Sequence, residues 1–152
     1  MPKLVIFAPC LKVIISERDD SLSLIALMDA ISVSVAEGAE VPADAKVPNP
    51  WDILTFWRNS PEDAGKEFEQ RTQLLLPNGE TSVEAIISFS GASRSQRNVI
   101  NVTGVPVGQA GECFLQLWLR EVGMDDWGDP VAEYSLVVVH QFVPGDRQQN
   151  EE

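Results

Sequence analysis

His140 is the only histidine in the chain, so any catalytic or zinc-binding set that needs an imidazole must use it. It lies in the apolar run 137–142, which predicts a strand. The sequence has no Gly-x-Ser-x-Gly elbow, and neither Cys10 nor Cys113 belongs to a Cys-x-x-Cys pair of the kind that holds zinc. We therefore predict that His140 has a structural partner. We also predict that the protein is not an enzyme and binds no metal or other cofactor.

Three carboxylates, Asp125, Asp126 and Asp129, surround Trp127 in a short loop. Calcium takes oxygen ligands, which clustered loop carboxylates can supply, but the spacing is not that of an EF-hand. An exposed indole can also stack on a sugar ring. The sequence leaves three interpretations open: a calcium or carbohydrate site, a solvated hairpin loop, or an indole that folds back over the end of the core.

Arg94 and Arg97 form the only concentrated basic feature, and they lie in a segment, 85–111, that contains no Asp or Glu. Guanidinium groups bind carboxylates and phosphates through paired N–H donors. The two arginines are therefore candidates for binding an anion or an acidic partner surface. The alternative is that they neutralise carboxylates of their own molecule.

The overall charge excludes one class of partner. Lys and Arg number 11 against 23 Asp and Glu, which gives a net charge of -12. Nucleic-acid binding relies on basic side chains that displace counterions, so we do not expect a nucleic-acid partner. No apolar run approaches the ~18 residues that span a bilayer, and the first residues do not resemble a signal peptide. We expect an acidic, soluble, cytoplasmic protein without a membrane partner.

The rest of the chain is dominated by alternating apolar and polar residues, which predict strands. The clearest pair, 68–76 and 82–89, flanks Asn78-Gly79, which is typical of a hairpin with a type I′ turn. Further strands are predicted at 11–16, 22–27, 31–35, 51–57, 98–107, 113–121 and 133–142.

This pattern predicts an all-β fold, a two-sheet antiparallel β-sandwich, immunoglobulin-like or similar, of about eight strands. Ser60–Asp63 has the sequence of a capping box, but we expect at most one short helical turn there. The Pro-rich segment 36–50 is predicted to be a surface connection. One domain is expected over residues 1–143, followed by a polar, disordered tail at 144–152. Core packing explains Trp51, Trp57 and Trp118.

Short motifs spread along the chain are similar to those of a family of small uncharacterised bacterial β-sandwich proteins with a domain of unknown function. The resemblance covers residues 2–139 and rests on turn and core positions, namely Ala8-Pro9-Cys10, Ser21–Ile25, Trp51-Asp52-Ile53, Leu76–Gly79, Val105-Pro106-Val107, Gly111–Phe114 and Glu133-Tyr134. Cys113 departs from the aromatic residue expected near that position. The resemblance implies a compact β-sandwich from a bacterial cytoplasm or prophage, and it carries no functional residue over.

These observations favour a non-enzymatic interaction or assembly module that self-associates or binds another protein. The strands at 99–107 and 134–142 carry little charge, and we expect them to be the edge or face strands that pair with a partner. The alternative is a ligand-binding module that uses loop 124–129 to bind a carbohydrate or calcium. The sequence identifies no particular small-molecule ligand.

Overall fold

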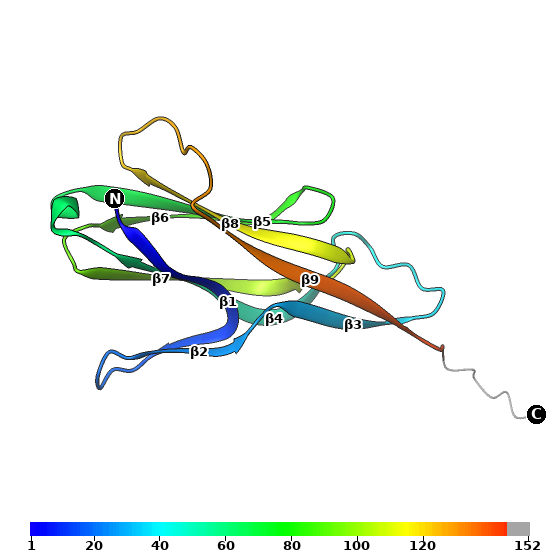
Figure 1. Ribbon diagram of the computed structural model, residues 1–152. Coiled ribbons are helices and arrows are strands. Elements are labelled where there is room, and N and C mark those ends of the chain that lie inside the picture. Colours follow the sequence, from blue (N-terminus) through cyan, green and yellow to red (C-terminus); the bar gives the residue numbers. More distant parts are fainter. Residues whose placement is uncertain (146–152) are drawn as a thin grey trace, which may run out of the picture.

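A computed structural model describes residues 1–145, which form nine strands and one short 3-10 turn (Figure 1). The elements are β1 (Lys3–Ile15), β2 (Leu22–Leu27), β3 (Ala30–Ala36), β4 (Lys46–Arg58), the 3-10 turn η1 (Pro61–Asp63), β5 (Glu67–Leu75), β6 (Thr81–Ser90), β7 (Ser95–Pro106), β8 (Gly111–Glu121) and β9 (Ala132–Val143). The predicted all-β class is confirmed, with nine strands where about eight were expected.

The strands form two sheets. The first has four antiparallel strands in the order β2-β1-β4-β7, and the second has five in the order β3-β9-β8-β5-β6. Within the second sheet β3 runs parallel to β9, so the expectation of a wholly antiparallel fold is wrong for this pair. The chain leaves the first sheet at Met28-Asp29 and joins the second beside β9, and this crossing fixes the direction of β3. The five-stranded sheet curls into a half-barrel.

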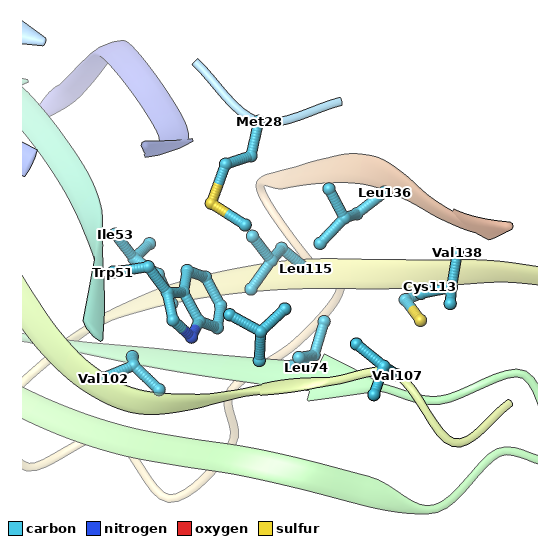
Figure 2. Close-up of a cluster of buried hydrophobic side chains, with 11 residues drawn as sticks. Met28, Trp51, Ile53, Leu74, Val102, Val107, Cys113, Leu115, Leu136 and Val138 are labelled. Carbon is cyan, nitrogen blue, oxygen red and sulfur yellow. The ribbon is translucent and has the colours of Figure 1, made fainter. Parts of the chain in front are cut away.

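Alternation along each strand decides which side chains are buried between the sheets. On β8, Cys113, Leu115 and Leu117 point inward, because successive strand residues face opposite sides. Cys113 and Leu115 join a cluster around Trp51 and Met28 that draws residues from both sheets (Figure 2). A second cluster contains Trp57, Phe68, Phe89, Leu117 and Leu119. The core-packing prediction for Trp51 and Trp57 is confirmed.

A buried polar network connects the two sheets through Gln70. Its Oε1 accepts hydrogen bonds from Thr55 Oγ1, Trp57 Nε1 and Asn98 Nδ2, each 2.8 Å long. An indole N–H can only donate, so the group that faces Trp57 must be the amide oxygen. The network therefore holds β4, β5 and β7 in a fixed register across the core.

The hairpin between β5 and β6 has a different turn from the one predicted. Gly79 has φ +86°, and Asn78 is not among the residues with positive φ, so the turn is not type I′. The Gly79 N–H donates to the Leu76 carbonyl, and the pairing shifts register between Leu74 and Leu75. Pro77 is the physical reason, because its ring fixes φ near −65° and favours a type I turn with glycine after it.

Two other expectations concern the segments on either side of β4. The predicted connection 36–50 is shorter in the structure, because Lys46–Pro50 already belongs to β4. The capping box at Ser60–Asp63 does form one helical turn, as predicted. There the Asp63 carboxylate accepts the Ser60 N–H at 2.8 Å. Residues 146–152 of the predicted tail lie outside the described residues.

Candidate functional site

The Trp127 loop, residues 122–131, folds back against the outer face of the five-stranded sheet. The Arg120 guanidinium lies 4.0 Å from the centre of the Trp127 ring, and that of Arg71 lies 5.4 Å from it. Arg71 also lies 4.3 Å from the centre of the Trp118 ring. Arg71 comes from β5, and Trp118 and Arg120 come from β8, all with side chains directed away from the core. The prediction of core packing therefore needs a correction for Trp118, which is buried on the outer face beneath Arg71.

An ion pair completes this group, which we call the Arg–Trp stack (Glu69, Arg71, Trp118, Arg120 and Trp127). Arg120 Nε lies 2.9 Å from Glu69 Oε2, and both side chains are about three-quarters buried. Cations above aromatic rings are attracted by the negative charge of the ring face. The stack therefore uses the half-buried Trp127 indole to attach the loop to the sheet. A sugar-stacking role for this indole gains no support from the arrangement.

The acidic residues of the same loop do not converge. Asp125, Asp126 and Asp129 are exposed, and Asp126 Oδ1 accepts the Gly128 N–H at 3.0 Å, which closes a local turn. Within residues 1–145, no three or more His, Cys, Asp or Glu side chains gather in a way that would hold a metal ion. The calcium alternative therefore also gains no support.

The two arginines of the predicted basic site have different surroundings. Arg97 donates to the Asp20 carbonyl at 2.6 Å, lies 3.7 Å from the Asp20 carboxylate and covers the Phe56 ring at 5.5 Å. It therefore acts within its own molecule. Arg94 is exposed and lines a shallow pocket of mixed polar and apolar residues. Because Arg97 and Phe56 belong to the four-stranded sheet, the structure does not bring Arg97 together with the Trp127 loop.

The β1–β2 hairpin is a feature that the sequence reasoning missed. Beyond Cys10 the hairpin is a two-stranded arm, because β4 pairs with β1 only between Lys3 and Cys10. In Figure 1 this blue arm projects from the body of the molecule. Five of its large apolar side chains are exposed, from 40% for Ile14 to 59% for Leu27, and the set is Leu11, Ile14, Ile15, Ile25 and Leu27. The sequence feature that could have pointed to this exposed apolar surface is the absence of charged residues from 21 to 28.

An apolar groove of about 490 Å³ lies beside the arm, between the ends of the two sheets. It is lined largely by aliphatic side chains, with Ser32, Ser34 and Asn49 as its polar members: Leu11, Ala26, Leu27, Met28, Ala30, Ile31, Ser32, Val33, Ser34, Val47, Asn49, Val105 and Val107. The Tyr134 hydroxyl donates to the Met28 carbonyl at 2.7 Å, which fixes the wall where the chain crosses from β2 to β3. Burial, followed by the nearby Asp29 charge, raises the pKa of Tyr134.

Sheet order also tests the predicted edge strands. The segment 99–107 belongs to β7, which lies at the end of its sheet as expected. The segment 134–142 belongs to β9, which lies between β3 and β8, so of the two alternatives, edge or face strand, the edge is excluded for this segment. The reason is that β3 adds beside β9 after crossing between the sheets. The other three ends of the sheets are β2, β3 and β6.

The single histidine and the two cysteines lie within strands β9, β1 and β8. His140 Nε2 contacts the Val107 carbonyl, which confirms the prediction of a structural partner. Cys10 and Cys113 are both buried and free. Burial raises the pKa of the Cys113 thiol, and burial together with the Asp52 carboxylate raises that of Cys10.

The described residues contain no helix long and apolar enough to cross a membrane. No family model matches the chain, and no curated protein matches it either.

Proposed function

We propose that this protein is a non-enzymatic interaction module that associates with a second copy of itself through the β1–β2 hairpin. The observation that carries the proposal is the exposure of five large apolar side chains on one short arm. A two-stranded ribbon is marginal by itself in water, and it gains stability when its apolar faces are covered. Exposed apolar groups that lie together indicate a contact surface.

The backbone of β2 supports strand pairing as the mode of contact. β2 lies at the end of its sheet, and Leu22–Leu27 contains no charge and no proline. Charged residues and prolines are the usual devices that protect an edge strand from pairing. The edges formed by β6 and β7 do carry them, in Glu84, Arg97 and Pro106. β3 is also uncharged and adjoins the groove, so it extends the same contact side.

The charge distribution favours a second copy in this place. Two chains that each carry -12 repel each other over most of their surfaces. Residues 21–35 include a single charged side chain, Asp29, so the repulsion is smallest there. In a two-fold dimer the same strand faces itself, and β2 would pair antiparallel with its copy.

The proposal extends to the type of fold. The two sheets enclose a shared core, and their strand orders support an immunoglobulin-like sandwich as the scaffold that presents the hairpin. The resemblance to uncharacterised bacterial β-sandwich proteins, and with it a cytoplasmic location, also remains a proposal. The excess of acidic residues supports a protein partner over a nucleic acid.

Light scattering after size exclusion tests the association. At roughly 100 µM, where micromolar contacts are populated, the wild-type protein should show twice the chain mass of 16.7 kDa. Ile25→Lys places a charge on the exposed side of β2 and should give a monomer. Ile86→Lys is the matched control, since Ile86 is 55% exposed on β6 against 47% for Ile25, and this variant should remain a dimer. A wild-type monomer, or equal effects of the two substitutions, would show that the hairpin is not the contact.

A further inference from the structure

The turn between β5 and β6 contains the only Asn-Gly pair of the sequence. The chain has six asparagines, and Asn78 is the one that glycine follows. Residues 77–80 are all exposed, and the turn lies at the end of the molecule opposite the 3-10 turn (Figure 1). A side-chain amide before glycine can react with the backbone nitrogen that follows it, because glycine has no Cβ to hinder the approach.

A hydrogen bond holds the Asn78 side chain beside the following peptide bond. Its Oδ1 accepts the Glu80 N–H at 2.9 Å, which closes an Asx turn around Gly79. In this turn the side-chain carbonyl carbon, Cγ, lies on the same side as the Gly79 nitrogen. The donated N–H also draws electron density away from Cγ, so this carbon becomes a better target for a nucleophile.

The surroundings of Gly79 are open. The residue has φ +86°, and no atom outside its chain neighbours lies within 4 Å of the place that a Cβ would occupy. Water therefore has access to this side of the backbone, and a reaction at Asn78 meets no steric barrier from the rest of the molecule.

Two other hydrogen bonds restrain the turn. The Gly79 N–H donates to the Leu76 carbonyl at 2.8 Å, and the Asn78 N–H donates to Gln109 Oε1 at 3.0 Å. Gln109 is itself held, because its Nε2 donates to the Ala43 carbonyl at 3.3 Å. The Gly79 nitrogen must lose its proton to react, so its bond to Leu76 has to open first. The turn therefore reacts from a locally opened form, which the Gln109 contact makes less frequent.

We propose that Asn78 is a site of spontaneous deamidation whose rate is limited by the Gln109 contact. The Gly79 nitrogen attacks Asn78 Cγ and forms a new C–N bond. The bond from Cγ to the side-chain nitrogen breaks, and this nitrogen leaves as ammonia, which carries away the proton from the Gly79 N–H. One water molecule then opens the succinimide ring at either of its carbonyl carbons, and the products are aspartate and isoaspartate.

The products change the turn in two ways. The new carboxylate adds a negative charge to a chain whose net charge is already -12. In isoaspartate the main chain runs through Cβ, so it is longer by one carbon between Leu76 and Glu80, whose backbone hydrogen bond closes the hairpin. Turn geometry fixes the register of a hairpin, so we expect the disturbance at the β5–β6 end. The β1–β2 hairpin belongs to the other sheet, and the inference is independent of self-association.

Mass spectrometry of tryptic peptides 72–94 and 98–120, after incubation of the full chain at mildly alkaline pH, tests the proposal. Asn101 is the internal control, because it is exposed on β7 but is followed by the β-branched Val102. Asn78 should convert about tenfold faster than Asn101, since a β-branched residue hinders the attack. Isoaspartate should form together with aspartate, because only the ring intermediate yields both. Equal rates at the two asparagines, or aspartate alone, would overturn the proposal.

Gln109→Ala tests the restraint, because it removes the acceptor of the Asn78 N–H and leaves the reacting atoms in place. Conversion of Asn78 should become about two- to threefold faster through more frequent opening, and conversion of Asn101 should not change. Gln116→Ala is the matched control, since Gln116 makes a hydrogen bond of 2.9 Å to Glu133 on the outer face of the sheet, and it should react like the wild type. A wild-type rate in Gln109→Ala would show that this contact does not limit the reaction.

Discussion

The Trp127 loop and the β1–β2 hairpin both extend from the two sheets, yet their side chains are used in opposite ways. The loop carries an indole and three carboxylates, and the Arg–Trp stack binds the indole back to the sheet. The hairpin carries simple aliphatic side chains, and five of the large ones face solvent. Both segments are anchored to the sheets. In the hairpin, the Val13 N–H donates to the Asp52 carboxylate at 2.8 Å, and the Asp20 carbonyl accepts a hydrogen bond from Arg97.

This difference shows that chemically distinctive residues are not always the available ones. Aromatic and charged groups form strong contacts with each other, so a folded chain tends to satisfy them internally. Aliphatic groups at an edge strand can be covered only by another surface. Removing a stack residue should therefore cost folding stability, whereas removing a hairpin side chain should mainly change association.

Arg71→Ala should have the largest effect on stability. Arg71 lies between two indoles, and its aliphatic part covers Trp118, so its loss removes both cation–π contacts and packing. We expect the free energy of unfolding to fall by about 2 kcal/mol, measured by urea denaturation. Ile25→Ala, which truncates a side chain that is 47% exposed on the hairpin, should change the free energy of unfolding by less than about 0.5 kcal/mol under monomeric conditions. Equal losses would contradict the contrast.

Trp127→Ala should lower the free energy of unfolding by a smaller amount, about 1 kcal/mol. The ring is half-exposed and attaches only its own loop to the sheet. Hydrogen exchange of the amides in 122–131 should become faster, while exchange in β8 should be unchanged. Met124→Ala, an exposed deletion in the same loop, provides the control and should alter neither quantity. A loop that exchanges equally fast in wild type and variant would show that the stack does not hold it.

Much of the fold was readable from the sequence because alternation is a local property. The inward and outward residues of β5, β6 and β8 follow from their period of two, and hairpins join neighbouring strands. Sheet order was harder to predict, because the crossing at Met28-Asp29 that places β3 beside β9 depends on non-local packing. The type I′ prediction was wrong because Pro77, just before Asn78-Gly79, restricts the turn.

The candidate sites were less predictable, for a related reason. Trp127 was singled out, but its partners Arg71 and Arg120 come from strands far away in the sequence. The shared outward parity of Glu69 and Arg71 was visible, yet it did not show which loop would cover them. The hairpin surface was missed because its residues resemble core residues, and exposure is decided by what packs above them.

Asp52→Ala should loosen the hairpin at a small cost in global stability. The Asp52 carboxylate accepts the Val13 N–H beyond the point, Cys10, at which β4 stops pairing with β1. We expect a loss of about 0.5 kcal/mol in urea denaturation, together with faster exchange of amides in 11–27. The Trp127 loop should be unaffected, and faster exchange there would show that the two regions are coupled.

The smallest predicted effect concerns the two thiols, which report separately on the hairpin and the core. Cys10 is opposite Leu27 in the hairpin register, and Cys113 belongs to the Trp51 cluster. Burial raises both pKa values above the reference of 9.0, and Asp52 raises that of Cys10 further. The native state therefore binds these protons more tightly than the unfolded state. Their contribution to stability is complete below pH 9.0 and is lost as the pH rises through the raised values.

Alkylation by iodoacetamide, quantified for each cysteine by mass spectrometry, can separate the two regions. Arg97→Gln removes the contact with Asp20 at the tip of the hairpin, so it should speed alkylation of Cys10 by about two- to threefold through local opening and leave Cys113 unchanged. Asp52→Asn should lower the pKa of Cys10 alone, which moves its reaction to lower pH. If both cysteines instead reacted faster to the same extent, the thiols would be exposed by global unfolding. The hairpin would then not be a separate unit able to open and pair with a second copy.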